Sequence, residues 1–132
     1  MARHMLLAVL CVTSALAGCL SPKTSGLWVE KGRLYLEDAA FATNLDIVQD
    51  AMERTPEGFL HVQVTVRNTN QHDYRCQYRF EWKTAQGMVQ THAHTPWRPA
   101  VLHGRDVTPL EAVSPLQGTA DFRLSIRRAD ER

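Results

Sequence analysis

The strongest constraint on the fold is a stretch of ten residues in which every second side chain is aromatic or a thiol. Residues 74–83 read YRCQYRFEWK, and residues 60–67 and 122–127 alternate in the same way with Leu, Val, Phe and Ile on one parity. Successive side chains of a β-strand point to opposite faces, whereas a helix would scatter them around its circumference. The alternation therefore predicts three antiparallel strands, each with one face in a core and one in solvent.

Turn-forming residues separate these runs, and weaker strand patterns fill the remainder of the chain. The weaker patterns cover residues 33–37, 45–53, 88–94, 100–103 and 107–113. Residues 46–54 could instead form a short helix with Ile47, Val48, Ala51 and Met52 on one side. Strands that recur about every ten residues are typical of a sandwich. We expect an all-β antiparallel β-sandwich of about seven strands.

The N-terminus reads as a targeting segment. Arg3 precedes a largely apolar run over residues 5–18, which is too short to cross a ~30 Å hydrocarbon core as a helix. The run ends in Leu16-Ala17-Gly18-Cys19, which resembles the lipobox of bacterial lipoproteins. This resemblance implies cleavage before Cys19 and a lipid anchor, with acyl chains such as palmitate, attached through the Cys19 thiol. Two or more acyl chains hold a protein firmly on a membrane.

The lipobox defines the expected organisation and location of the chain. We expect a signal peptide over 1–18, a lipidated cysteine and flexible tether over 19–30, and a periplasmic β-sandwich domain over 31–132. Leu20 follows the cysteine where Asp, by resemblance to enterobacterial lipoproteins, would retain the protein at the inner membrane. The resemblance thus implies the outer membrane, facing the periplasm. Because Cys11 leaves with the signal peptide, Cys76 is the one free thiol expected in the mature chain.

Several motifs together resemble one lipoprotein family. The motifs are VTVRNT at 64–69, YRFEW at 78–82, Trp97 and ADFRL at 120–124. They resemble the YcfL-like family of small bacterial outer-membrane lipoproteins, and the resemblance covers residues 45–128. It implies an immunoglobulin-like β-sandwich, and it implies no activity because the family has no established biochemical function. Cys76 departs from the family pattern, since no fixed thiol is expected on the inner face of that strand.

The composition and the motifs argue against several classes of function. The chain has fifteen basic and fourteen acidic residues, for a formal net charge of +1. A nucleic-acid binder is not expected, because it would need a large basic excess. Cys76 has the parity of core residues, and Ser125 lacks a Gly-x-Ser-x-Gly elbow. The sequence has no glycine-rich phosphate loop. We therefore expect no enzyme, no catalytic residue and no cofactor.

A metal-handling role is the alternative hypothesis. His92 and His94 would point to one face of a strand, and Met88 has the same parity. Imidazole and thioether donors suit copper, and imidazole suits zinc. The alternative is a periplasmic copper- or zinc-binding protein, although the sequence supplies no third ligand and we assign no metal residue.

Arginine is unusually frequent, at twelve of the fifteen basic residues. Arg67, Arg75, Arg79, Arg123 and Arg127 all have outward parity on the predicted strands. In an immunoglobulin-like order the strands at 74–83 and 120–128 share a sheet, and the strand at 60–67 lies in the other. We thus predict one patch of Arg75, Arg79, Arg123 and Arg127.

Arginine suits carboxylate and phosphate partners, so the patch could bind an anionic glycan, a lipid head group or an acidic envelope protein. The alternative is a solvated face balanced by Glu81 and nearby acids. The sequence predicts a membrane-anchored, non-catalytic binding or accessory module of the cell envelope. It indicates neither the partner nor the oligomeric state.

Overall fold

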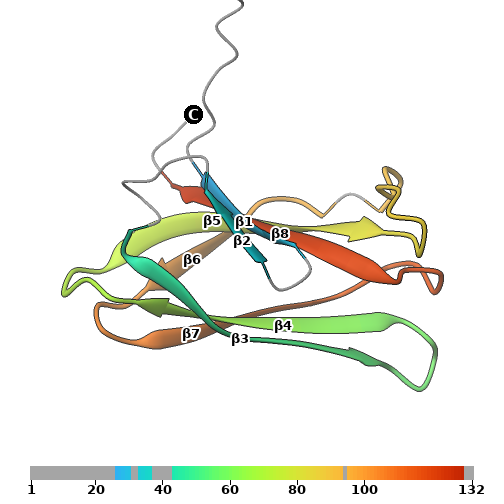
Figure 1. Cartoon of the computed structure of the whole chain (residues 1–132), viewed down its shortest axis with the longest axis horizontal. Coiled ribbons are helices and arrows are strands. Elements are labelled where there is room, and N and C mark those ends of the chain that lie inside the picture. Colours follow the sequence, from blue (N-terminus) through green and yellow to red (C-terminus); the bar gives the residue numbers. More distant parts are fainter. Residues whose placement is uncertain (1–25, 31–32, 37–42, 94, 130–132) are drawn as a thin grey trace, which may run out of the picture.

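The structure is a computed structural model that describes residues 26–30, 33–36, 43–93 and 95–129. These residues form eight strands (Figure 1). The strands are β1 (Gly26–Glu30), β2 (Arg33–Leu36), β3 (Leu45–Arg54), β4 (Leu60–Asn68), β5 (Tyr74–Lys83), β6 (Arg98–Leu102), β7 (Val107–Val113) and β8 (Asp121–Arg128). The described part of the chain contains no helix long and apolar enough to cross a membrane.

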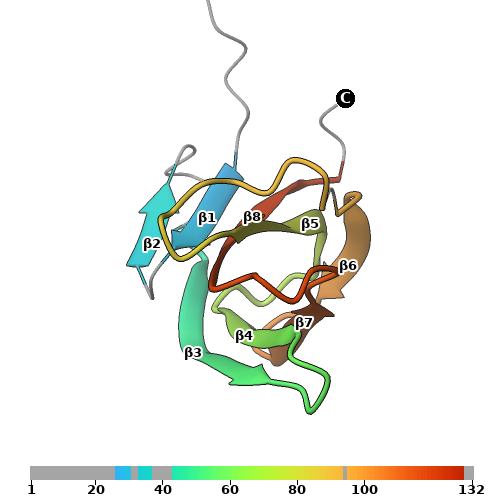
Figure 2. The same ribbon diagram turned by 90° about the vertical axis from the view of Figure 1, so that its right-hand side faces the viewer.

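The strands form two stacked antiparallel sheets. One sheet has five strands in the order β2-β1-β8-β5-β6, and the other has three in the order β3-β4-β7. Figure 2 shows the two layers from the side, with β8, β5 and β6 above β4 and β7. The expected all-β sandwich is therefore confirmed. As predicted, β5 and β8 share a sheet and β4 lies in the other.

The alternating residues form the core between the layers. Val62, Val64 and Val66 of β4 are fully buried, and they face the aromatic side chains of the other sheet. Phe80 stacks on Trp82 with ring centroids 5.7 Å apart and packs against Phe122 at the same distance. The side-chain parity predicted for β4, β5 and β8 is thus the observed one, because a core on one side of each sheet requires period-two burial.

The helix considered over residues 46–54 does not form. Strand β3 pairs with β4 along its whole length, with a register shift between Ile47 and Gln49 that marks a β-bulge at Val48. Beyond the bulge Asp50 and Met52 are exposed, although their partners on β4 are buried core residues. The apolar spacing that resembled a helix therefore comes from a bulged edge strand.

Two boundaries differ from the sequence expectations. Residues Gly26–Glu30, expected in the tether, pair with β8 and extend the sheet. The strand expected over 88–94 is absent from the described residues of that range, which form turns and one isolated bridge between Lys83 and Val89. Irregular bonds replace the ladder there: Gln90 N donates to Trp82 O, and the Thr95 hydroxyl donates to Phe80 O.

A buried asparagine fixes the loops at one end of the sandwich. The Asn68 side chain is 0% exposed, and its Nδ2 donates to the carbonyls of His72 at 2.8 Å and Leu102 at 2.9 Å. Its Oδ1 accepts from Asn70 N at 2.9 Å. Next to this network, a Cβ on Gly104 would lie 2.2 Å from the carbonyl oxygen of Gln71, so only glycine fits. These contacts tie the β4–β5 and β6–β7 loops together.

Candidate functional site

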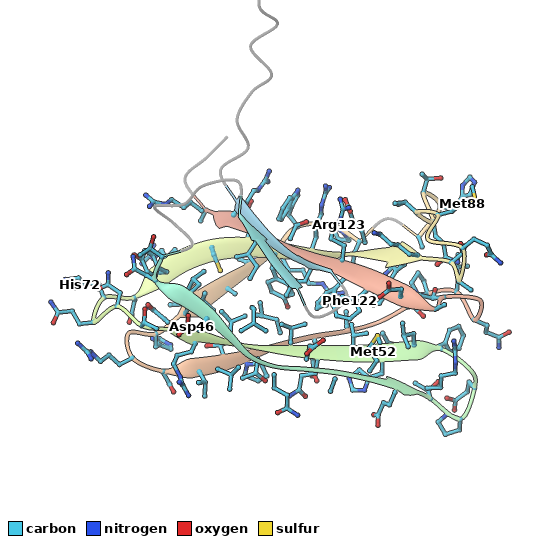
Figure 3. All side chains as sticks on the ribbon, in the orientation of Figure 1. Asp46, Met52, His72, Met88, Phe122 and Arg123 are labelled. Carbon is cyan, nitrogen blue, oxygen red and sulfur yellow. The ribbon has the colours of Figure 1, made fainter. Side chains whose placement is uncertain are left out.

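The outer face of the five-stranded sheet brings together side chains from β5 and β8. The pairing register places Gln77 opposite Arg127, Arg79 opposite Ser125, and Glu81 opposite Arg123. Figure 3 shows Arg123 on the outer side of this sheet, whereas Phe122, one residue earlier, points between the layers. All four predicted arginines therefore lie on one surface, Arg75 and Arg79 on β5 and Arg123 and Arg127 on the neighbouring β8. We call this surface the arginine face, and it consists of Arg75, Arg79, Arg123, Arg127 and Trp97.

Trp97 is the organising residue of the arginine face. It comes from the segment just before β6, and its half-buried indole ring lies close to two guanidinium groups. Arg127 Cζ is 4.0 Å from the ring centroid, and Arg79 Cζ is 4.6 Å from it. Cation–π contacts of this kind contribute about 0.5–1 kcal/mol each at partly exposed sites. The stack fixes the planes of two arginines that would otherwise be free to rotate.

A glutamine and a glutamate also hold the guanidinium groups of the arginine face in place. Arg127 Nε donates to Gln77 Oε1 at 2.9 Å. Glu81 lies between two arginines, with its Oε1 3.0 Å from Arg79 Nη2 and its Oε2 3.8 Å from Arg123 Nη1. The Glu81 side chain is 24% exposed. Glu81 therefore offsets part of the positive charge of Arg79 and Arg123, whereas Arg75 and Arg127 lie nearer the other end of the face.

The charge is unevenly distributed along the sheet. Strands β5, β6 and β8 contain two acids, Glu81 and Asp121, and both lie where β5 ends and β8 begins. Arg75 is exposed at the opposite end, where β5 begins. Guanidinium groups bind phosphate and carboxylate through paired N–H donors. The acid-poor end of the face is chemically suited to anionic groups.

Arg67 lies elsewhere, as the strand order predicts. It is exposed on β4, in the three-stranded sheet. It faces solvent on the opposite side of the sandwich from the arginine face. Arg67 therefore supplies a matched surface arginine for comparison.

Only one of the two histidines considered as metal ligands is described by the structure, and it does not lie on a strand. His92 is exposed in a turn, His94 lies outside the described residues, and the Met88 side chain is 69% exposed. Among the described residues no three or more His, Cys, Asp or Glu side chains are grouped so that they could hold a metal ion. The described residues 88–93 thus do not form the strand that motivated the copper or zinc hypothesis.

Of the two cysteines considered for function, the structure describes only Cys76. Cys76 is 1% exposed in the core, and burial raises the pKa of its thiol to about 11. A thiol with so high a pKa is a poor nucleophile at neutral pH. Cys19, the predicted lipidation site, lies outside the described residues.

One charged group was not anticipated from the sequence. His61 Nδ1 lies 3.0 Å from Glu53 Oε1, and His61 Nε2 lies 3.5 Å from Glu111 Oε2. Hydrogen bonding to Glu53, followed by the contact with Glu111, raises the pKa of His61 above 6.5. The three residues come from β3, β4 and β7 on the outer face of the three-stranded sheet. The outward parity of His61 was visible in the sequence, but its two acidic neighbours depend on strand pairing.

Comparison with known proteins identifies relatives of the same architecture. The family model described as "Protein of unknown function (DUF1425)" matches residues 32–128. A crystal structure of a DUF1425 family member from Shewanella sp. pv-4 is similar at 23% identity and TM-score 0.58, covering 83% of this chain and 94% of that one.

The crystal structure of Campylobacter jejuni cj0090 is similar at 19% identity and TM-score 0.56, covering 62% of this chain and 84% of that one. The comparison with curated proteins gave no match. At these identities the two solved structures support the fold alone.

Proposed function

Since the chain belongs to the DUF1425 family, whose description records no function, we propose from its geometry that it is a membrane-anchored, non-catalytic binding module of the bacterial cell envelope. Within that family we place it with the YcfL-like lipoproteins of the outer membrane, on the motifs at 64–69, 78–82 and 120–124. The proposed anchor is the acylated Cys19, with the domain in the periplasm. The proposed ligand carries phosphate or carboxylate groups.

The observation that carries this proposal is the stack of Arg79, Trp97 and Arg127. Exposed arginines are usually flexible, and ordering their side chains for binding costs conformational entropy. Here the indole ring and Gln77 already order two guanidinium groups on a rigid sheet. Preorganised donors on neighbouring strands bind an anion with a smaller entropic cost than mobile ones.

The test is binding of the full chain, in detergent, to immobilised heparin as a generic polyanion. We expect salt-dependent retention, because exposed charges are screened beyond ~8 Å at physiological ionic strength. Arg75→Glu and Arg127→Glu should each lower the salt concentration needed for elution, and the double variant should lower it further.

Arg67→Glu is the matched control, because it changes net charge equally on the opposite sheet. It should elute close to the unmodified protein. Equal losses from Arg67→Glu and Arg75→Glu would mean that only net charge matters and that the arginine face is not a site.

A further inference from the structure

The point at which the tether joins the domain lies beside the arginine face. Gly26 is the first residue of β1, and it pairs with Arg127 of β8. Arg127 pairs in turn with Gln77 of β5, and on its other side Gln77 pairs with Pro99 of β6. These four residues form one row across the five-stranded sheet, and Figure 2 shows the four strands side by side. The chain therefore enters the fold in the same row as Arg127, at the acid-poor end of the sheet.

The tether is too short to let this end move far from the membrane. Seven residue steps separate Cys19 from Gly26. A fully extended chain covers at most about 3.6 Å per residue, so Gly26 stays within about 25 Å of an acylated Cys19. The ten residues of β5 span about 33 Å at ~3.3 Å per residue. The arginine end of the sheet is thus held close to the bilayer, and the acidic end can lie farther away.

The charges at the anchored end suit a phosphate surface. Arg75 of β5 and Arg127 of β8 have the same outward parity and lie at this end of the sheet, with Arg127 in the row of Gly26 itself. The described acids of the adjoining loops are already engaged: Asp73 Oδ1 accepts from Gly104 N at 2.9 Å and its Oδ2 lies 3.1 Å from His103 Nδ1, and Asp106 Oδ1 accepts from Val107 N at 2.8 Å. Glu81 and Asp121 are at the other end of the sheet. Among the described residues of β5, β6 and β8, both acids therefore lie at the end away from Gly26.

We propose that the arginine face docks on the phosphate head groups of the membrane that holds the lipid anchor, with Trp97 at the head-group level. This inference rests on the proposed anchorage at Cys19 and names the ligand of the proposed site. Tryptophan, with an apolar ring and one polar N–H, is favoured at membrane interfaces. A short tether keeps the head groups at high effective concentration, whereas a glycan or an acidic protein would have to be captured from solution.

The experiment uses the full lipidated chain reconstituted into vesicles. One set is phosphatidylcholine alone, and the other contains about 30% phosphatidylglycerol. Each arginine near an anionic surface favours contact by about 1 kcal/mol, or about fivefold. The readout is quenching of Trp97 fluorescence by head-group spin-labelled lipid, obtained as the difference from Trp97→Phe because Trp28 and Trp82 also emit.

We expect stronger Trp97 quenching in the anionic vesicles, and Arg75→Glu should lower the ratio of docked to undocked protein about fivefold or more. Arg67→Glu should leave it unchanged. If the protein floats with the vesicles and Trp97 quenching is equal in both lipid compositions, or if Arg67→Glu has the same effect as Arg75→Glu, the docking inference is overturned and the anchor stands. If the protein does not float at all, the anchorage itself is wrong, and the docking inference falls with it.

Discussion

Among single residues, Cys76 has a side chain that is only 1% exposed and a thiol whose pKa burial raises to about 11. Its parity on β5 already predicted this burial, because it alternates with solvent-facing Arg75 and Gln77. The thiolate is the reactive form, and it is scarce at neutral pH when the pKa is so high.

We predict that a thiol reagent such as Ellman's reagent leaves Cys76 unmodified in the native protein at pH 8. Modification should follow global unfolding in urea, because only then does water reach the sulfur. Rapid modification without denaturant would contradict the buried position. Cys76→Ala provides the background rate from the remaining cysteines.

Arg79 illustrates how tertiary contacts change the energetic role of one side chain. Outward parity alone predicts that Arg79→Ala costs less than ~1 kcal/mol, as for an ordinary surface residue. In the structure Arg79 also stacks on Trp97 and pairs with Glu81 at 3.0 Å. Because these contacts are partly exposed, we expect a combined loss of about 1 kcal/mol, which is still small beside the core.

At the scale of elements, the two faces of β5 make different contributions to stability. Phe80 and Trp82 are each 1% exposed and stack with ring centroids 5.7 Å apart. Large-to-small changes at such positions cost about 3–5 kcal/mol, out of ~5–15 kcal/mol for a whole domain. We predict that Phe80→Ala and Trp82→Ala lower the free energy of unfolding by that amount in urea melts, several times the effect of Arg79→Ala. Similar losses from all three variants would show that the two faces are not energetically distinct.

The three-stranded sheet has a pH-dependent contact on its outer face. His61 bonds Glu53 of β3 and approaches Glu111 of β7, and its pKa is raised above 6.5 in the fold. A raised folded-state pKa means that protonated His61 stabilises the native state. This contribution is complete below about pH 6.5 and is lost as the pH rises through the raised value.

We predict a lower urea midpoint at pH 8.5 than at pH 6 for the unmodified protein. The difference should shrink in His61→Gln, which keeps a polar side chain but cannot titrate. The effect should be small because the His61 side chain is 30% exposed and solvent screens the pair. An identical pH dependence in both proteins would assign the change to other groups.

At the scale of the whole molecule, the anchor decides whether the protein is a membrane module. The lipobox ending at Cys19 predicts that Cys19→Ser abolishes incorporation of labelled fatty acid and leaves the signal peptide uncleaved. Cys11→Ser, in the same apolar run, should be labelled normally, because only the cysteine after the cleavage site is acylated. Unchanged labelling of Cys19→Ser in cells would refute the lipoprotein assignment.

Local alternation in the sequence predicted most of the strands. The predictions that were wrong concern segments in which this alternation is weak. The alternation over 60–67, 74–83 and 122–127 predicted three strands and their inner faces. Residues 26–30 contain three consecutive apolar residues, Leu27, Trp28 and Val29, and so lack the alternation; the run is also only five residues long and adjoins a polar tether. Residues 88–94 contain apolar and histidine residues at strand spacing, yet a strand needs a partner ladder, and the described residues 88–93 form only isolated bonds.

The sequence by itself determined which side chains face the core and which face solvent, because period two is a property of a single extended strand. It also determined the arginine content and the lipobox. Only the tertiary structure decided which outward residues meet. Trp97 reaches Arg79 and Arg127 from a different segment, and His61 finds Glu53 and Glu111 across two strand pairings. Such contacts join residues distant in the chain, and their partners are set by strand order and register, which local spacing does not encode.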